Sequence, residues 1–279
     1  RKDGNRRDVG ESIICRHIEC TRGIDVHVEI RFEPRPDYGR GDVQLELDPF
    51  GATSPDGRLV LRCSHRIEWT DPEAGEGVIR VSHGDDARLV LFYDPVDIPR
   101  DLIAWTDAML FDTRAYWELW ASRCLYRGQW RRLVERSALT LKLLTFKPTG
   151  AILAAPTASL PEGIGGVRNW DYRFSWLRDS ALIINALFLL GYHEEASEYV
   201  QWILANRSPD GPIPILYAIG PEDTTEEREL LHLSGYRDSK PVRIGNGARD
   251  QVQLDVYGEV LDALFLYGVY GGEISAEIW

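Results

Sequence analysis

Five segments in the first hundred residues alternate between apolar and polar side chains. A period of two predicts β-strands, because successive side chains of a strand point to opposite faces of its sheet. Turn-forming residues separate the segments, for example Ser-Pro-Asp-Gly at residues 54–57. We therefore predict an antiparallel β-sandwich over residues 1–100, with strands at residues 24–32, 43–47, 58–63, 77–82 and 87–93.

The apolar spacing changes near residue 100. Farther along, apolar residues recur every three or four positions, which predicts α-helices joined by long loops and almost no sheet after residue 130. We expect linker helices within residues 101–130 and a helical domain over residues 131–279. The predicted class is α+β with more than one domain, and the predicted helices are at residues 112–120, 130–146, 176–190, 194–206 and 249–270.

The predicted helices differ in how their apolar residues are distributed. Residues 176–190 are apolar on nearly every side, which predicts a helix that is buried all round. Residues 194–206 and 249–270 each carry a single apolar stripe, which in the second segment consists of Val252, Val256, Val260, Leu264 and Tyr267. This sequence of helices fits an inner and an outer helical ring, although an ordinary helical bundle would show the same periodicity.

The charge of the chain limits its partners. The 279 residues carry a net charge of −12. An acidic protein repels nucleic acids and anionic membrane surfaces, whereas a neutral ligand such as a sugar is compatible with it. No apolar run reaches the roughly 18 residues of a transmembrane helix. We therefore expect neither a nucleic-acid partner nor a membrane partner.

The cysteines and histidines are scattered. Cys15, Cys20, Cys63 and Cys124 form no C-x-x-C pair, and the histidines form no H-E-x-x-H motif. We therefore expect no metal site and no cofactor. A chain of this size needs no disulfides, and reduced thiols fit a cytoplasmic location. A bridge between Cys15 and either Cys20 or Cys63 stays open.

The densest polar and aromatic cluster lies at residues 169–180, which read Asn-Trp-Asp-Tyr-Arg-Phe-Ser-Trp-Leu-Arg-Asp-Ser. Aromatic rings can stack on the apolar faces of sugars, and an Arg-Asp pair can hold vicinal hydroxyls. An apolar run follows at once, so the cluster lies at a helix start, where loops meet a rigid scaffold. Composition alone equally permits core aromatics beside a local ion pair.

The segment 207–248 is too long for a simple connection, because loops beyond about 15 residues are usually functional or disordered. Its acidic run at residues 222–229 is expected to be solvated. Polar groups return at residues 235–239 and 243–246, just before the last predicted helix. We expect this loop to form one wall of a pocket.

Three ordered segments carry a family resemblance. Residues 169–180 resemble the first signature segment of glycoside hydrolase family 15, which contains glucoamylases and bacterial trehalases. Residues 141–162 (Leu-Lys-Leu-Leu-Thr-Phe-Lys-Pro-Thr-Gly-Ala-Ile-Leu-Ala-Ala-Pro-Thr-Ala-Ser-Leu-Pro-Glu) are similar to its linker and first barrel helix. Residues 241–259 (Pro-Val-Arg-Ile-Gly-Asn-Gly-Ala-Arg-Asp-Gln-Val-Gln-Leu-Asp-Val-Tyr-Gly-Glu) are similar to the second substrate-lining segment of its bacterial members.

The resemblance implies a fold, an activity and a binding site. The implied fold is a β-sandwich followed by part of a double-ring (α/α)6 barrel. The implied activity is inverting hydrolysis of α-glucosidic bonds, with an α-glucoside or oligosaccharide as substrate. The residues expected to bind this substrate are Trp170, Tyr172, Trp176, Arg178, Asp179, Arg243, Asn246 and Gln251.

The resemblance assigns no catalytic residue to this chain. Inverting glycosidases need an acid and a base about 6.5–9.5 Å apart, and the family's acid and base lie downstream of the matched segments. We therefore expect them beyond Trp279 and interpret the chain as an internal piece, which begins within the sandwich and is inactive by itself. Glu162, Glu259, Asp262, Glu273 and Glu277 have no family counterpart in either role.

Two other functions stay open. A non-catalytic carbohydrate-binding protein would keep the sugar-lining residues and lack the carboxylate pair. A phosphorolytic relative would need a phosphate-binding nest, and the sequence shows no Gly-rich phosphate loop. Trehalose and malto-oligosaccharides both stay open as substrates.

Overall fold

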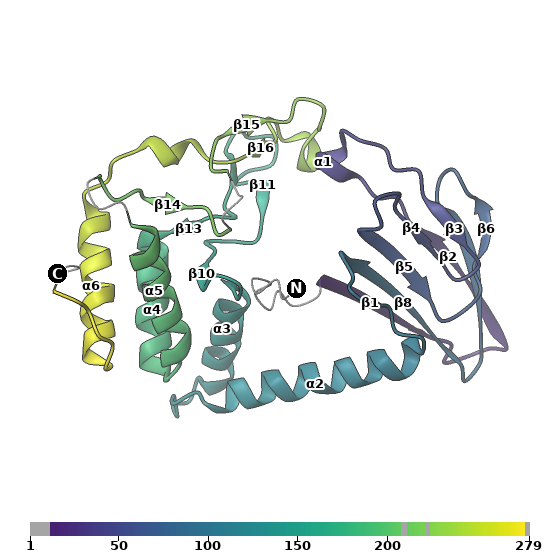
Figure 1. The fold of residues 1–279 in the computed structure, drawn as a ribbon, viewed down its shortest axis with the longest axis horizontal. Coiled ribbons are helices and arrows are strands. Elements are labelled where there is room, and N and C mark those ends of the chain that lie inside the picture. The colour runs from purple at the N-terminus through teal and green to yellow at the C-terminus, as the bar shows by residue number, and fades with distance from the viewer. Residues whose placement is uncertain (1–11, 208–210, 221–223, 277–279) are drawn as a thin grey trace, which may run out of the picture. The chain divides into compact units, whose positions relative to one another are not determined.

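The computed structural model describes residues 12–207, 211–220 and 224–276. The chain forms two compact units, one that ends at Trp117 and one that runs from Glu118 onward. The change from one unit to the other falls inside α2 (Leu102–Ser122), the long helix in Figure 1. The division at residues 100 and 130 stays a prediction.

The first unit contains two antiparallel sheets. The strand order is β1-β8-β5-β4-β3 in the five-stranded sheet and β2-β7-β6 in the three-stranded sheet. All five predicted segments overlap a strand, and the prediction missed β1, β4 and β6. The strands are β1 (Ser12–Glu19), β2 (Asp25–Arg31), β3 (Glu46–Asp48), β4 (Gly51–Thr53), β5 (Leu59–Cys63), β6 (Glu68–Asp71), β7 (Glu76–Ser82) and β8 (Asp86–Tyr93).

The missed strands have weak patterns for physical reasons. The β1 strand is at the edge of its sheet, pairs with β8 alone, and has mostly exposed side chains. Only Ile13 and Ile18 of β1 pack against the buried clusters, so the strand shows little alternation. The β4 and β6 strands have three and four residues, which is too short to show a period of two. The segment α1 (Pro36–Gly39) is a turn, because Asp37 and Tyr38 have left-handed backbone angles.

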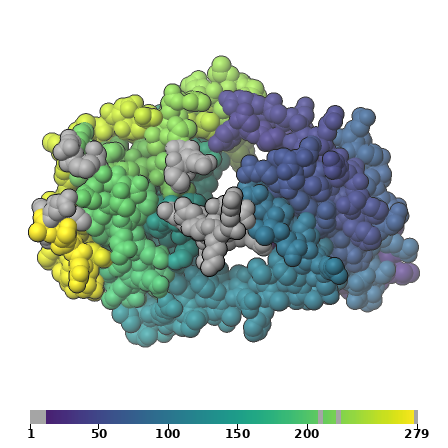
Figure 2. Space-filling view, viewed as in Figure 1, coloured from purple at the N-terminus to yellow at the C-terminus, as the bar shows by residue number. Residues whose placement is uncertain are grey.

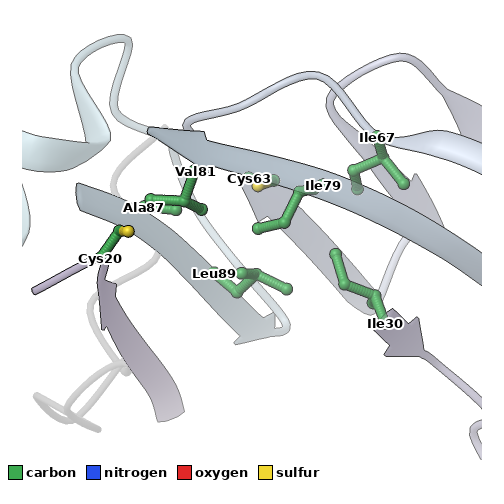
Figure 3. Close-up of a cluster of buried hydrophobic side chains, with 8 residues drawn as sticks. All are labelled: Cys20, Ile30, Cys63, Ile67, Ile79, Val81, Ala87 and Leu89. Atoms are coloured by element: carbon green, nitrogen blue, oxygen red, sulfur yellow. The ribbon is translucent and has the colours of Figure 1, made fainter. Parts of the chain in front are cut away.

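The two sheets share one hydrophobic core, which Figure 3 shows in close-up. The three-stranded sheet contributes Ile30, Ile79 and Val81, and the five-stranded sheet contributes Cys63, Ala87 and Leu89, all buried. Side chains from both sheets therefore meet in one layer, as expected when sheets pack face to face. The prediction of an N-terminal region of antiparallel sheet is confirmed. All four cysteines are free, and Cys20 and Cys63 are buried in this core.

The helices follow in chain order α2, α3 (Arg131–Leu143), α4 (Leu177–Leu190), α5 (His193–Asn206) and α6 (Asp255–Val269). The α2 helix begins ten residues before its predicted start. Asp101 accounts for this, because its carboxylate accepts the backbone N–H of Ala104 at 3.0 Å, in the manner of an N-cap. In the part of the chain that the structure describes, every helix is too short or too polar to span a lipid bilayer.

The α4 helix corrects one prediction. It packs against α5 and α6, but its side chains are not buried all round. Ile184, Leu187 and Phe188 are buried, whereas Leu182 is 64% exposed and Leu189 is 68% exposed. The contacts with α5 and α6 cover one face of the helix and leave the face of Leu182 and Leu189 open. Within the described residues, that face has no covering element.

The α6 helix lies beside α4 and α5 (Figure 1; Figure 2). Its predicted stripe is confirmed at Val256, Val260, Leu264 and Tyr267, which are buried. The predicted helix start is wrong, since α6 begins at Asp255 and Val252 is 67% exposed. Residues 247–250 form the short 3-10 helix η2 (Gly247–Asp250), which Asn246 caps by accepting the backbone N–H of Ala248.

Short antiparallel ladders correct the prediction of almost no sheet after residue 130. They are too brief to produce an alternating pattern, and most of their strands have two residues. The pairs are β9 (Thr145–Phe146) with β10 (Ala151–Ile152), β11 (Ala158–Pro161) with β12 (Asn169–Asp171), β13 (Ser175–Trp176) with β14 (Leu216–Tyr217), and β15 (Arg228–Glu229) with β16 (Arg243–Ile244).

Candidate functional site

One pocket of the second unit brings together most of the predicted site residues. Its volume of about 520 Å³ lies in the range of small-molecule sites. Seven of the eight predicted residues line it, and Arg243 does not. The lining consists of Ala154, Trp170, Tyr172, Trp176, Arg178, Asp179, Ile215, Glu227, Asn246, Gly247, Ala248, Gln251 and Gln253.

Three elements present the residues of the 169–180 segment. Trp170 is on β12, Trp176 is on β13, and Asp179 is in the first turn of α4. A carboxylate is favourable in that turn because of the partial positive charge at a helix N-terminus. One guanidinium nitrogen of Arg178 lies 3.2 Å from Oδ2 of Asp179. The side chains of both residues are about half exposed, so this pair is accessible from the pocket.

Tyr172 and Trp176 form the aromatic part of the lining. Their ring centroids are 5.7 Å apart and their planes are tilted by 48°. Burial raises the pKa of the Tyr172 hydroxyl, and the negative charges of Glu162 and Asp179 add to this effect. The phenol therefore stays protonated near neutral pH and can donate a hydrogen bond to a ligand oxygen.

A network of three buried hydroxyl groups holds the chain segment that carries this part of the pocket lining. The Tyr199 hydroxyl on α5 lies 3.0 Å from Oγ of Ser175, which in turn lies 3.4 Å from Oγ of Ser180. All three residues are buried. Ser175 precedes Trp176 and Ser180 follows Asp179, so the network fixes the chain on both sides of the lining residues. No sequence pattern indicated this role for Tyr199, because the sequence placed it only within the apolar stripe of residues 194–206.

Asp171 joins the two walls of the pocket, and the sequence interpretation missed it. Its fully buried carboxylate accepts hydrogen bonds from Nε of Arg173 at 2.9 Å and from the backbone N–H of Gly245 at 3.1 Å. Its backbone carbonyl accepts a hydrogen bond from Nδ2 of Asn246 at 3.1 Å. The sequence interpretation gave this aspartate no role, because two of its partners, Gly245 and Asn246, lie more than 70 residues away in the chain.

Arg243 contacts the lining from outside the pocket. Its guanidinium carbon lies 4.9 Å from the ring centroid of Trp170, within the range of a cation–π contact. Its Nε lies 3.3 Å from Oε1 of Glu227. The predicted contact of Arg243 with sugar stays a prediction, whereas its contacts with two lining residues are features of the structure.

Glu227 is the main lining residue that the sequence interpretation missed. The acidic run at residues 222–229 was expected to be solvated, and Glu227 in this run is partly buried and lines the pocket. Pairing of β15 with β16 folds the run back along the chain, and the Gly247 backbone N–H donates to Oε2 of Glu227 at 2.9 Å. Residues 222 and 223 lie outside the described residues. Gln253 also lines the pocket and was missed.

The pocket can hold a neutral polar ligand. It combines aromatic rings with amide side chains, and its charged lining residues are Arg178, Asp179 and Glu227. These groups supply both donors and acceptors beside apolar faces, as sugar binding requires. Within residues 12–207, 211–220 and 224–276, no group of three or more His, Cys, Asp or Glu side chains is arranged to hold a metal ion.

Known proteins match the chain over most of its length. Trehalase from Mycolicibacterium smegmatis is 36% identical over 283 residues, which cover 96% of this chain and 42% of that protein. Trehalase from Thermoplasma volcanium is 36% identical over 255 residues, which cover 91% of this chain and 41% of that protein. Trehalase from Thermoplasma acidophilum is 46% identical over 170 residues, which cover 61% of this chain and 29% of that protein. The chain thus spans at most about two fifths of the length of these relatives.

The family comparison covers the part of the chain that contains the pocket. The sequence model of glycosyl hydrolases family 15 matches residues 128–279, which include every residue of the lining. The three segments that carried the resemblance all lie within this match. The chain belongs to glycosyl hydrolases family 15.

Proposed function

We propose that the full-length protein hydrolyses α-glucosidic bonds with inversion, and that trehalose is its substrate. The observation that carries the proposal is the pocket, which gathers the sugar-type residues of two chain segments in a family 15 protein. Trehalose is favoured over malto-oligosaccharides because the relatives that match along the chain are trehalases.

The described residues hold the sugar in this proposal. Trp176 and Tyr172 offer aromatic faces to the ring, and the Arg178–Asp179 pair offers a donor and an acceptor for neighbouring hydroxyls. Asn246 and Gln251 add amide groups from the loop. We assign the acid and the base to no residue of the pocket. Asp179 and Glu227 each already pair with an arginine, which suits them to holding the ligand.

The proposal extends to the fold and the location. We infer that α3 to α6 form part of an (α/α)6 barrel within residues 131–279, preceded by linker helices at 101–130 and a sandwich at 1–100. The packing of α4 against both α5 and α6 supports this arrangement. Free cysteines support a cytoplasmic location, since thiols persist in reducing compartments.

The test measures binding and turnover together. The full-length protein should release glucose from trehalose, and calorimetry should detect trehalose binding. Asp179→Ala removes a charge-assisted hydrogen bond, so it should weaken binding of the sugar by about 1.5–3 kcal/mol. Asp262→Ala, on the exposed side of α6, is the matched control and should change neither measurement.

Each alternative predicts a different result in the same test. Binding without glucose release would favour the carbohydrate-binding function. Formation of a sugar phosphate, dependent on added inorganic phosphate, would favour phosphorolysis. Faster turnover of maltose than of trehalose would overturn the choice of substrate. Unchanged binding in Asp179→Ala would remove the assigned role of the Arg178–Asp179 pair.

A further inference from the structure

We propose that Glu227 is an additional sugar-binding residue of the pocket, and that Arg243 is the positioning residue that holds it. The Glu227 carboxylate would accept a hydrogen bond from a hydroxyl of a neutral sugar. This inference rests on the proposed function, because it concerns the same pocket and the same class of ligand.

One hydrogen bond and one ion pair hold the Glu227 carboxylate without using all of its acceptor capacity. Oε2 accepts the backbone N–H of Gly247 at 2.9 Å, and Oε1 lies 3.3 Å from Nε of Arg243. A carboxylate offers about four acceptor sites, so two remain beyond these contacts. The side chain is 29% exposed, and it is part of the pocket lining. The remaining acceptor sites are therefore available to a ligand.

Arg243 is held on several sides, which makes it suited to positioning. One terminal nitrogen donates to the carbonyl of Val167 at 2.8 Å, and the guanidinium lies over the Trp170 ring. Both backbone groups of Arg243 bond to the hydroxyl of Ser159. The Arg243 side chain is only 14% exposed. Because Arg243 lies outside the lining, it acts on the ligand through Glu227 and Trp170.

The charges of the lining select the ligand class. Arg178 contributes one positive charge, while Asp179 and Glu227 contribute two negative charges, so the charged lining residues sum to −1. An anionic ligand such as a sugar phosphate would meet net repulsion there. A neutral sugar presents only hydroxyls, which donate well to carboxylates. Glu227 therefore favours uncharged over phosphorylated glucosides.

Glu229 provides a matched control. Its Oε1 lies 3.5 Å from another nitrogen of the same Arg243, but Glu229 does not belong to the lining. Glu227→Gln and Glu229→Gln make the same chemical change, and each removes one ion pair of Arg243. Only Glu227→Gln removes a charge from the pocket.

The experiment is calorimetric titration of the protein with a non-hydrolysable trehalose analogue, because the active protein would consume trehalose during the titration. Glu227→Gln should weaken binding about tenfold or more, because it replaces a charge-assisted hydrogen bond by a neutral one. Glu229→Gln should stay within about twofold of the unchanged protein. Arg243→Lys should weaken binding as Glu227→Gln does, and combining the two changes should add little, since both act through one carboxylate. Urea denaturation of each variant checks that it is folded.

The outcomes separate this inference from the proposed function. Binding within about twofold in Glu227→Gln, together with a large loss in Asp179→Ala, would overturn the role of Glu227 and leave the proposed function intact. Equal losses in Glu227→Gln and Glu229→Gln would also overturn it, because the effect would then run through Arg243 alone. If the unchanged protein binds neither trehalose nor maltose, both proposals are wrong.

Discussion

The carboxylate of Asp171 accepts the backbone N–H of Gly245 at 3.1 Å, although 74 positions separate the two residues in the chain. The neighbouring Asn246 donates its side-chain amide to the Asp171 carbonyl at the same distance, 3.1 Å. These bonds tie the segment of Trp170 and Tyr172 to the loop that carries Asn246 and Gln251. The buried Asp171 is therefore one of the residues that hold the two polar walls of the pocket together.

Asp171→Ala should destabilise the protein. Breaking a buried ion pair costs about 3–5 kcal/mol, because one charge stays uncompensated. The Arg173 side chain is 36% exposed and can regain water, so we expect a loss of about 2–3 kcal/mol in the free energy of unfolding. Urea denaturation measures it. Asp250→Ala is the control, since Asp250 is 82% exposed in its pair with Arg249. Equal stability of the two variants would contradict the role of Asp171.

Gly245→Ala should distort the loop wall. Gly245 has a φ of +74°, and a Cβ there would lie 1.8 Å from the carbonyl oxygen of Glu226. Left-handed strain costs about 1–2 kcal/mol, and forced overpacking adds about 1–3 kcal/mol. Gly165→Ala is the matched control, because Gly165 has a φ of +78° but no heavy atom within 4 Å of the added Cβ. Thermal denaturation should show a larger loss of stability for Gly245→Ala than for Gly165→Ala. Similar losses of stability in the two variants would argue against the clash.

Tyr199→Phe should weaken the support under the pocket. The change removes the hydroxyl that lies 3.0 Å from Oγ of Ser175, at a cost of about 1 kcal/mol. Tyr116→Phe is the control, since Tyr116 is 51% exposed. The free energies of unfolding of the two variants, measured by urea denaturation, should differ by that amount. A loss of stability as large in Tyr116→Phe would contradict the structural role of the Tyr199 hydroxyl.

Tyr199 also makes a prediction for alkaline pH. Burial raises its pKa, because it disfavours the charged phenolate. The folded state then holds a proton that the unfolded chain releases above about pH 10. The contribution of Tyr199 to stability is thus complete below pH 10 and declines as the pH rises further. Urea denaturation between about pH 9 and pH 11, a range around the ordinary tyrosine pKa, measures this decline. The free energy of unfolding should fall less steeply with pH in Tyr199→Phe than in the unchanged protein.

Glu195 should make stability sensitive to acid. Burial works against its ionisation, but hydrogen bonds from Trp120 and from Lys142 outweigh burial and keep the pKa of this carboxyl below its usual range. Trp120 Nε1 lies 2.5 Å, and Lys142 Nζ 3.0 Å, from Oε1 of Glu195. With a lowered folded pKa, this stabilisation is present above the unfolded pKa and is lost as the pH falls through the folded pKa.

Glu195→Gln tests this pH dependence. At neutral pH it leaves the Lys142 charge, whose side chain is 10% exposed, without a partner, which costs about 3 kcal/mol or more. As the pH falls below about 4.3, where glutamate ordinarily titrates, the unchanged protein should lose stability and approach the variant. Glu194→Gln is the control, because the Glu194 side chain is 70% exposed. A difference between Glu195→Gln and the unchanged protein that stays constant with pH would contradict the assignment.

Local patterns were sufficient for the main elements. Period-two patterning between turn-forming clusters predicted β2, β5, β7 and β8, and it was strictest in β2, where alternate side chains point to opposite faces of the sheet. A period near 3.6 predicted α3, α4 and α5 to within three residues at each end. The polar cluster at residues 169–180 was visible for the same reason, since it interrupts these patterns just before an apolar helix.

The sequence by itself thus determined the class of each long element and the two segments that form the pocket. Tertiary structure alone decided that Asp171 is buried and that Glu227 faces the pocket. Each of these depends on a partner far away in the chain. A periodicity records which face of an element is apolar, but the free energy of burying a residue depends on what covers that face, and that covering exists only once the chain has folded.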